Sequence, residues 1–305
     1  MTSVVVPPWH PHLDVLVILG AVVYAYVWAD RSSVVHATRA QRTLFFCGVG
    51  VMLVAAYWPL HDLAEYNSFA LHMVQHLLFQ LVAVPLVLLG LPDEIARRIM
   101  MRPGRLGAVL RGAVRPGAAL ALSMGFVVFS HWPIVVDAAV RIEPLHFVLH
   151  VALVLTSVAM WWPVLSPTNA VPRLAPQWAV GYLIIQTIIP TVPASFLTWT
   201  GDVVYHGYDG HPTLWGLSTA DDQRLAGLIM KIIGGMVIWG YIAAVFFRWA
   251  SQSERADRAE RAERAQRASS TSQGAPATQP SPALVADPSA PTVPAAAAGA
   301  TVSRR

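Results

Sequence analysis

Seven apolar stretches constrain this chain more than any other feature, because each is long enough to cross the ~30 Å hydrocarbon core of a bilayer. They lie near residues 13–29, 43–60, 69–91, 117–136, 145–165, 178–198 and 225–247. Unpaired backbone groups are costly in lipid, so membrane spans are helices or closed barrels, and runs of this length indicate helices. We therefore predict an all-α polytopic membrane protein, a seven-transmembrane helix bundle over residues 13–249.

The composition excludes a soluble protein. Of the 305 residues, 55% are hydrophobic and 12% are charged, whereas soluble domains carry about 25% charged residues. The basic residues lie in loops and in the C-terminal tail and form no stripe, so nucleic acid is not an expected partner. Cys47 is the only cysteine, which excludes an intrachain disulfide and a metal cage built from one chain's thiolates.

Arginine residues predict the orientation of the chain. Ten lie in loops on one side of the predicted bundle: Arg31, Arg39, Arg42, Arg97, Arg98, Arg102, Arg105, Arg111, Arg115 and Arg173. The opposite loops hold only Arg141 and Arg224. Because basic loops stay in the cytoplasm, we expect the N-terminus outside and the C-terminus inside. All histidines except His36 then lie on or near the outer face, and we interpret His10, His12 and His36 as ordinary surface residues.

Both ends of the chain differ from the bundle. Residues 1–12 carry no Lys or Arg, so we expect a short extracytoplasmic N-terminus and no cleaved signal peptide. Residues 250–305 form the predicted cytoplasmic tail. Its Arg-Ala-acid triplets from Glu254 to Arg267 predict a charged, solvated segment that can prolong the last helix. Beyond residue 270 the Ser, Thr, Pro, Gln and Ala content predicts disorder.

Prolines and glycines predict irregular backbone inside the bundle. Pro85 is expected to kink the third stretch, and Pro190 with Pro193 to break the sixth near its outer end. The longest outer loop, residues 199–224, fits either a lid or an ordinary glycine-rich loop. The basic stretch between Pro92 and Pro116 carries apolar residues among its arginines, which fits an interfacial helix on anionic membrane lipid.

Two histidine pairs open the third and fifth apolar stretches at the same depth: His72 with His76, and His146 with His150. Histidines four residues apart lie on one helix face with Cβ atoms about 5–6 Å apart, so a pair can share one ion or bond a neighbouring helix. Two copies at matched depth favour a metal site over packing, because polar side chains inside a membrane are costly. The predicted ligands are His72, His76, His131, His146 and His150 with the thioethers of Met73 and Met230.

Charged residues near these ligands are predicted to support them. Metal-binding histidines usually bond an acid through the second ring nitrogen, and Asp62, Glu65 and Asp137 are placed for this. Lys231 either reaches outward to an acid or contributes its charge to the site, while Asp221 or Asp222 fits the N-cap of the last stretch. Imidazole suits zinc, copper, iron or nickel and thioether selects Cu(I), so copper is favoured over zinc.

Several motifs resemble a known family. They are Trp58-Pro59-Leu60, Leu63-Ala64, the run from His72 to Leu78, Pro85, Leu89 to Pro92, His131-Trp132-Pro133, Leu145 to His150, Trp161 to Leu165, Asp222-Gln223 and Gly227 to Met230. In this order, over about residues 13–249, they resemble the CtaG-type cytochrome c oxidase assembly factors of bacteria, the kind associated with caa(3) oxidase. The five histidines above and Asp222 are the motif positions that the resemblance carries over.

The resemblance implies a multi-pass protein of the bacterial plasma membrane that matures a copper–haem oxidase by handling copper on the outer side. Oxidase subunits or another copper carrier would be its partners, and it would be an assembly factor rather than an enzyme. Two alternatives remain open. One is a membrane-embedded zinc hydrolase with Asp62, Glu65 or Asp137 as base. The other is a b-type haem protein, although adjacent histidines on one helix face suit a small ion better.

Overall fold

A computed structural model describes residue 9, residues 11–211 and residues 214–273, with side chains through residue 267. The described part is helical and contains no strand, which confirms the all-α prediction. The chain divides into one unit over residues 1–252 and a second over residues 253–305. The tail beyond residue 273, where we predict disorder, and most of the predicted N-terminal segment lie outside the described residues.

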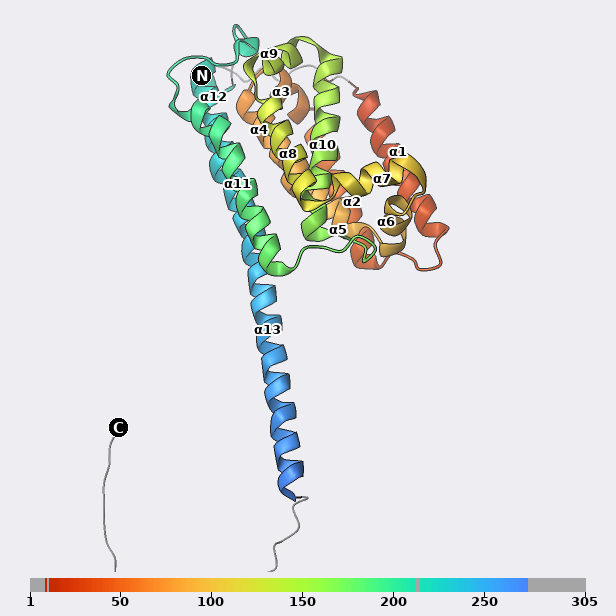
Figure 1. Cartoon of the computed structure of the whole chain (residues 1–305). Coiled ribbons are helices and arrows are strands. Elements are labelled where there is room, and N and C mark those ends of the chain that lie inside the picture. The colour runs from red at the N-terminus through yellow and green to blue at the C-terminus, as the bar shows by residue number, and fades with distance from the viewer. Residues whose placement is uncertain (1–8, 10, 212–213, 274–305) are drawn as a thin grey trace, which may run out of the picture. The chain divides into compact units, whose positions relative to one another are not determined.

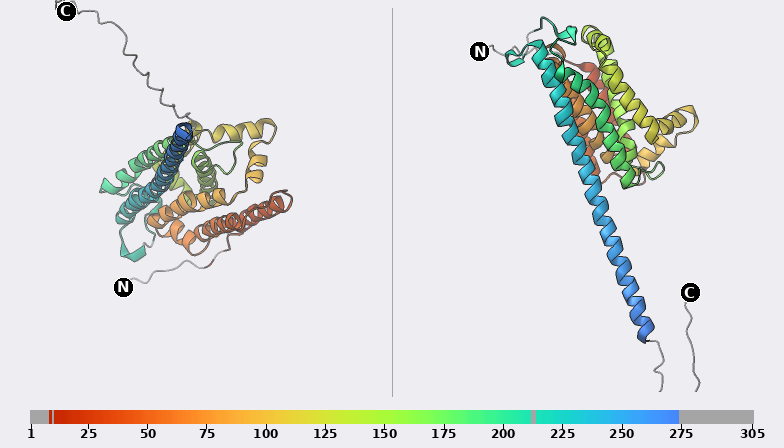
Figure 2. Two further views of the ribbon diagram at one scale, coloured as in Figure 1. Left: turned by 90° about the horizontal axis from the view of Figure 1, so that it is seen from below. Right: turned by 60° about the vertical axis from the view of Figure 1, so that its left-hand side comes forward.

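Figure 1 shows the helices and the longer connections that precede α11 and α12. In chain order the helical elements are α1 (Leu13–Arg31), α2 (Arg39–Ala56), α3 (Leu60–Tyr66), α4 (Phe69–Leu77), the π-helical η1 (Leu78–Ala83), α5 (Val84–Gly90), α6 (Asp93–Met100), α7 (Gly104–Ala113), α8 (Pro116–Ser130), α9 (Pro133–Arg141), α10 (Glu143–Leu165), α11 (Pro176–Trp199), the 3-10 turns η2 (His206–Tyr208) and η3 (Leu214–Gly216), α12 (Thr219–Leu228), the π-helical η4 (Ile229–Ile233) and α13 (Gly234–Gln273). In two views α11 runs alongside α12, and α1 lies at the edge of the bundle (Figures 1 and 2).

Six helical segments of the described chain are long and apolar enough to cross a membrane, or seven if α7 and α8 form one bent span. The protein is therefore a multi-pass membrane protein. The fourth predicted stretch, residues 117–136, is wrong at its outer end, because α8 stops at Ser130 and α9 starts at Pro133. Proline disfavours helical backbone in the residue before it, and Trp132 accordingly has an extended ψ of 131°.

Hydroxyl caps move two helix starts ahead of their predicted positions. The backbone N–H of Gln41 donates to Thr38 Oγ1 at 3.2 Å, so α2 begins at Arg39 rather than at residue 43. Ser218 Oγ accepts from the N–H of Asp221 at 3.1 Å and caps α12. The predicted N-cap at Asp221 or Asp222 is therefore wrong: a serine just before the helix satisfies the same free N–H groups.

The predicted break in the sixth stretch is also wrong, because α11 continues through Pro190 and Pro193. Proline inside a helix removes one backbone donor and crowds the carbonyl four residues earlier, and its fixed φ still lies in the helical range. A lipid environment offers the remaining backbone groups no partner outside the helix, which favours its continuation.

Pro85 is associated with a π-helical turn, η1, in the third stretch. Proline lacks the N–H that would bond a carbonyl four or five residues earlier. Those carbonyls are both satisfied by side chains: Gln80 O accepts from Trp161 Nε1 at 2.7 Å, and Leu81 O accepts from Tyr241 Oη at 3.1 Å. Two distant helices thus complete the hydrogen bonding that the proline interrupts.

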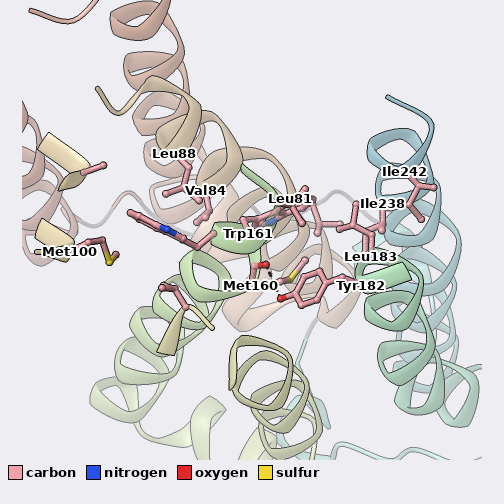
Figure 3. Close-up of a cluster of buried hydrophobic side chains, with 14 residues drawn as sticks. Leu81, Val84, Leu88, Met100, Met160, Trp161, Tyr182, Leu183, Ile238 and Ile242 are labelled. Atoms are coloured by element: carbon pink, nitrogen blue, oxygen red, sulfur yellow. Dashed lines mark hydrogen bonds between the residues drawn. The ribbon is translucent and has the colours of Figure 1, made fainter. Parts of the chain in front are cut away.

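The largest apolar core includes residues of η1 and of the helices around it. Figure 3 shows Leu81, Trp161, Leu183 and Ile238 converging from the third stretch, α10, α11 and α13. The hydroxyl of Tyr182 donates to the carbonyl of Met160 at 2.9 Å within the same core. Burial of these side chains fixes α10 against the helix that carries His72 and His76.

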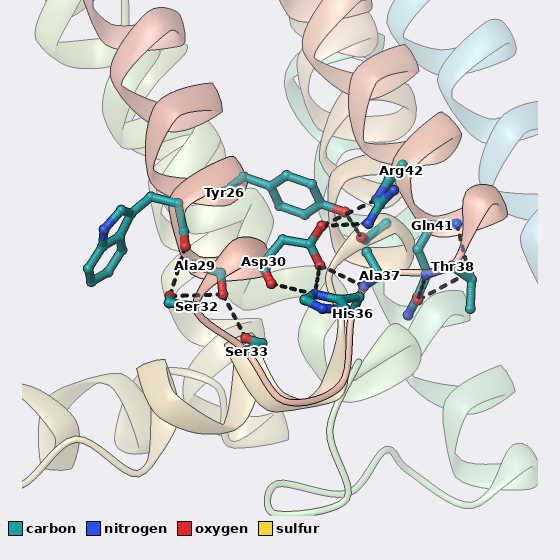
Figure 4. Close-up of polar contacts among 12 residues, drawn as sticks. Tyr26, Ala29, Asp30, Ser32, Ser33, His36, Ala37, Thr38, Gln41 and Arg42 are labelled. Atoms are coloured by element: carbon teal, nitrogen blue, oxygen red, sulfur yellow. Dashed lines mark hydrogen bonds and ion pairs between the residues drawn. The ribbon is translucent and has the colours of Figure 1, made fainter.

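The α1–α2 turn is held by Asp30, which accepts from the N–H of Ala37 at 2.6 Å and pairs with Arg42 at 2.9 Å (Figure 4). His36 Nδ1 lies 2.8 Å from the carbonyl of Asp30, with its side chain 58% exposed, in agreement with its prediction as a surface residue. In the second unit, all described side chains of residues 253–267 are exposed, and Glu254 pairs with Arg258 at 3.4 Å.

Candidate metal centre

The structure brings the two histidine pairs together between α4 and α10. His150 Nε2 lies 3.2 Å from His146 Nε2 and 3.2 Å from His76 Nε2. Ligand nitrogens of His72, His146 and His150 lie within 4.8 Å of one another. These four imidazoles, the His cluster, form part of the lining of a cavity of about 30 Å³, which is large enough for one water or one ion.

The spacing of these nitrogens fits a single ion. Two nitrogens bound to a tetrahedral ion at about 2.0–2.1 Å lie about 3.3–3.4 Å apart. The two nitrogen–nitrogen distances at His150 are both 3.2 Å, close to that value. Two of the separations that one bound ion requires are therefore present at His150.

Hydrogen bonding alone does not satisfy the His cluster. A neutral imidazole nitrogen carries either one hydrogen or one lone pair. His150 Nε2 faces two other ring nitrogens and can complete only one good hydrogen bond with them. His72 Nδ1 is buried and has no hydrogen-bond partner among the described residues. A cation would accept lone pairs from several of these nitrogens at once.

Glu65, a predicted supporting acid, lies beside the His cluster. Its two carboxylate oxygens lie 3.4 Å from His146 Nδ1 and 3.5 Å from His61 Nε2. Burial alone would raise the pKa of Glu65, but the neighbouring imidazoles outweigh burial and hold the pKa below its usual value. A carboxylate behind a histidine orients the ring and makes the opposite nitrogen a better ligand.

The other predicted supporting residues have different partners. Asp62 Oδ1 lies 3.0 Å from His12 Nε2, and Asp137 Oδ1 accepts from the N–H of Gly207 at 2.8 Å. Lys231 Nζ donates to Ser195 Oγ at 3.2 Å and pairs with no acid in the described chain. Sequence spacing indicated proximity to the His cluster for these residues, but in the structure they bond to groups outside the cluster that are distant in the sequence.

Asp222 was predicted beside the metal ligands, but it caps the helix that carries two of them. Its carboxylate accepts from Ser68 Oγ at 2.6 Å and from the N–H groups of Phe69 and Ala70 at 2.6 and 3.3 Å. These groups lie at the start of α4. The first N–H groups of a helix have no partner within the helix, and they favour a nearby negative charge. Asp222 therefore fixes the start of the helix that presents His72.

Two histidines near the His cluster were not among the predicted ligands. The rings of His12 and His61 lie 4.7 Å apart, and the His61 ring lies 5.8 Å from that of His146. The interpretation of His12 as an ordinary surface residue is wrong, because its side chain is 15% exposed and bonds Asp62. His61 and Glu65 are four residues apart in an acidic segment, so they lie on one helix face. That spacing was the sequence signal that places His61 beside the predicted supporting acid.

His131, Met73 and Met230 lie beside the His cluster and line a different cavity. The His131 ring lies 6.4 Å from the His76 ring. Of the predicted ligands, the structure therefore gathers four histidines at one point and places these three residues at an adjoining one.

The loop between α11 and α12 places aromatic side chains beside the His cluster. Tyr205 and Tyr208 are buried, and their rings lie 4.7 and 5.4 Å from that of Phe69. Tyr205 Oη donates to the carbonyl of His131 at 3.0 Å, and Tyr208 lines the cavity of the His cluster. Burial raises the pKa of both phenols. The loop between α11 and α12 thus contributes one wall of the cavity, at Tyr208.

A sequence model of the cytochrome c oxidase caa3 assembly factor family matches residues 22–252, more than half of the chain. The chain belongs to this family. No curated protein and no solved structure matches the chain. The matched residues include the whole His cluster and Asp222. The candidate metal centre of this caa3 assembly factor therefore lies within the part of the chain that the family model describes.

Proposed function

We propose that this caa3 assembly factor binds copper as cargo in the His cluster and helps to deliver it to a cytochrome c oxidase. The observation that carries the proposal is the approach of His150 Nε2 to two other imidazole nitrogens at 3.2 Å each. Glu65 behind His146 supports it, because such pairs are typical of metal-binding histidines. Oxidase subunits or another copper carrier would receive or supply the ion.

Copper fits the surroundings of the His cluster better than zinc does. All four ligands are imidazoles, which bind either metal, but the adjoining cavity adds the thioethers of Met73 and Met230, and thioethers prefer Cu(I). A zinc hydrolase needs a base beside the metal-bound water. Glu65 lies behind His146 at its Nδ1 atom, while the ligand atom Nε2 faces the other histidines. This arrangement supports ion binding over hydrolysis.

The proposed location is the outer side of the bacterial plasma membrane. It follows from the ten arginines at the other end of the bundle. In a Cys47→Ser background, His206→Cys should react with a membrane-impermeant thiol reagent in intact cells, and Arg105→Cys should not. The reverse labelling pattern would place the His cluster on the cytoplasmic side.

Anaerobic loading with Cu(I) tests the binding. Full-length protein should retain copper after desalting. A triple variant with His72→Ala, His146→Ala and His150→Ala should lose the copper that is bound by the His cluster. His206→Ala is the matched control, because His206 is exposed and bonds Asp209 outside the His cluster. Equal copper with only nitrogen scatterers in the triple variant and in the wild type would refute the proposal.

The biological role needs a separate test in cells. A deletion strain should assemble an oxidase with low copper content under limiting copper. Wild-type protein and the His206→Ala control should restore the copper content, and the triple histidine variant should not. Full oxidase copper in the deletion strain would rule out delivery, whatever the purified protein binds.

A further inference from the structure

A second cavity of about 350 Å³ adjoins the His cluster between α4, α8, α11 and the last span. Four of the nine methionines in the chain line it: Met73, Met124, Met160 and Met230. Two imidazoles, His76 and His131, line it as well. We call this space the methionine cavity.

Three of these methionines are buried and also border open volume. Met73, Met124 and Met160 are 3%, 5% and 1% exposed, yet each borders open volume. A core that uses methionine as a flexible filler closes such gaps, because the unbranched side chain adapts to its surroundings. The Met160 sulfur lies 3.4 Å from Gln80 Nε2, so a side-chain amide orients this thioether.

His131 contributes a lone pair to the cavity. Its Nδ1 lies 2.8 Å from the carbonyl of Val127, which can only accept, so Nδ1 carries the hydrogen. The other nitrogen, Nε2, is then an acceptor, and it is buried with no hydrogen-bond partner among the described residues. A buried lone pair without a donor is costly, and a bound cation would remove that cost.

Both π-helical segments of the described chain border this cavity. η1 contributes Gln80 and Leu81, and η4 contributes Met230 and Lys231. A π-helical turn inserts one residue, redirects the side chains around it and occurs frequently at functional sites. Two such turns on facing spans indicate that the backbone is shaped around this space.

We propose that the methionine cavity is a second binding site for a soft monovalent cation, Cu(I), separate from the His cluster and joined to it through His76. Neutral thioethers and imidazoles suit a soft ion of low charge. Lys231 is the only charged residue in the lining, and its ammonium group bonds Ser195 Oγ and lies 5.8 Å from the centre of the Trp199 ring. The site requires no metal in the His cluster.

His76 gives the two sites a shared ligand. It lines both cavities, its Nε2 lies 3.2 Å from His150 Nε2, and its ring lies 6.4 Å from that of His131. An ion can therefore exchange thioether ligands for imidazoles while one bond to His76 is retained. The methionine cavity would hold the ion before or after the His cluster does.

Metal binding to full-length protein tests this site with Ag(I), a soft cation that does not change its oxidation state here, and with Cu(I). The test variant changes Met73, Met124, Met160 and Met230 to Leu, which removes the sulfur atoms and nearly conserves volume. The control variant carries Met52→Leu and Met100→Leu, because these methionines lie outside the lining. We expect the test variant to bind one equivalent less Ag(I) than the wild type and the control.

X-ray absorption of the Cu(I) form identifies the ligands. Sulfur scatterers should be present in the wild type, the Met52/Met100 control and the triple His72, His146 and His150 variant, and absent from the test variant. A test variant with wild-type metal content and sulfur scattering would overturn the second site. Wild-type copper with nitrogen scatterers alone would also overturn it and leave the His cluster proposal intact.

A single substitution provides a second test that does not depend on correct folding of the four-leucine variant. His131→Phe removes the unpartnered nitrogen and keeps a planar ring, and it should reduce Ag(I) affinity at least tenfold without changing the Cu(I) affinity of the His cluster. Unchanged Ag(I) affinity in this variant would exclude His131 from the site and contradict the proposal.

Discussion

Asp222 Oδ1 accepts a hydrogen bond from Ser68 Oγ at 2.6 Å, although the two residues are 154 positions apart. Both side chains are buried, at 3% and 0% exposure. The bond ties α12 to the start of α4, and Ser68 Oγ in turn accepts from the N–H of Leu71 at 3.2 Å. The first His pair is therefore positioned by a carboxylate that binds no histidine.

Replacement of that carboxylate should loosen the helix it caps. Asp222→Ala leaves the first N–H groups of α4 without their acceptor, and loss of a cap costs about 0.5–2 kcal/mol. We expect a lower thermal midpoint in detergent and weaker Cu(I) retention. Asp221→Ala is the control, because Asp221 is exposed and pairs with Arg224 on its own helix. Equal effects of the two substitutions would contradict the capping role.

Glu65→Gln should weaken metal binding without removing a ligand. The amide keeps the shape of the side chain but loses the charge that faces His146 and His61. Loss of such a supporting carboxylate typically lowers metal affinity about 10–100-fold. Competition against a Cu(I) chelator measures the change, with Glu143→Gln as control because Glu143 is exposed. An unchanged affinity would mean that Glu65 serves folding alone.

Gly90→Ala should destabilise the packing of α5 on α2. A Cβ atom at Gly90 would lie 2.7 Å from the carbonyl oxygen of Gln41 and closer still to the backbone nitrogen of Phe45, so the helices must separate. Overpacking of this kind costs about 1–3 kcal/mol. Gly50→Ala meets nothing within 4 Å and should not lower the thermal midpoint, because alanine favours the helix more than glycine does. The two variants should differ by several degrees, and similar midpoints would refute the close approach.

Acidification should destabilise the protein through His61. Burial lowers the pKa of His61 to about 4, below the value of about 6.5 in an unfolded chain. As pH falls from 6.5 towards 4 the unfolded chain takes up the proton first, so the folded state loses about 3 kcal/mol. His61→Gln should flatten this decline in the thermal midpoint, and His36→Gln should not. Parallel pH profiles for the wild type and His61→Gln would contradict the prediction.

The two His pairs show how much of the site could be predicted from the sequence. Spacing and depth predicted that His72, His76, His146 and His150 would meet, because a helical period and the thickness of a bilayer fix both quantities. The supporting residues were harder to predict. Of the proposed acids only Glu65 faces a histidine of the His cluster, since each carboxylate also had a nearby backbone or imidazole donor that sequence spacing does not reveal.

The sequence alone determined the helical class, the presence of several membrane-spanning segments and the spacing of the histidines within each pair, because hydrophobic length and helical period are local properties. Only the tertiary structure decided that Asp222 caps α4, that α11 continues through Pro190, and that Met124 and Met160 share a cavity with His131. These outcomes depend on which of several available partners a polar or flexible side chain meets. Long-range packing sets that choice, and it brings together residues 154 and 160 positions apart.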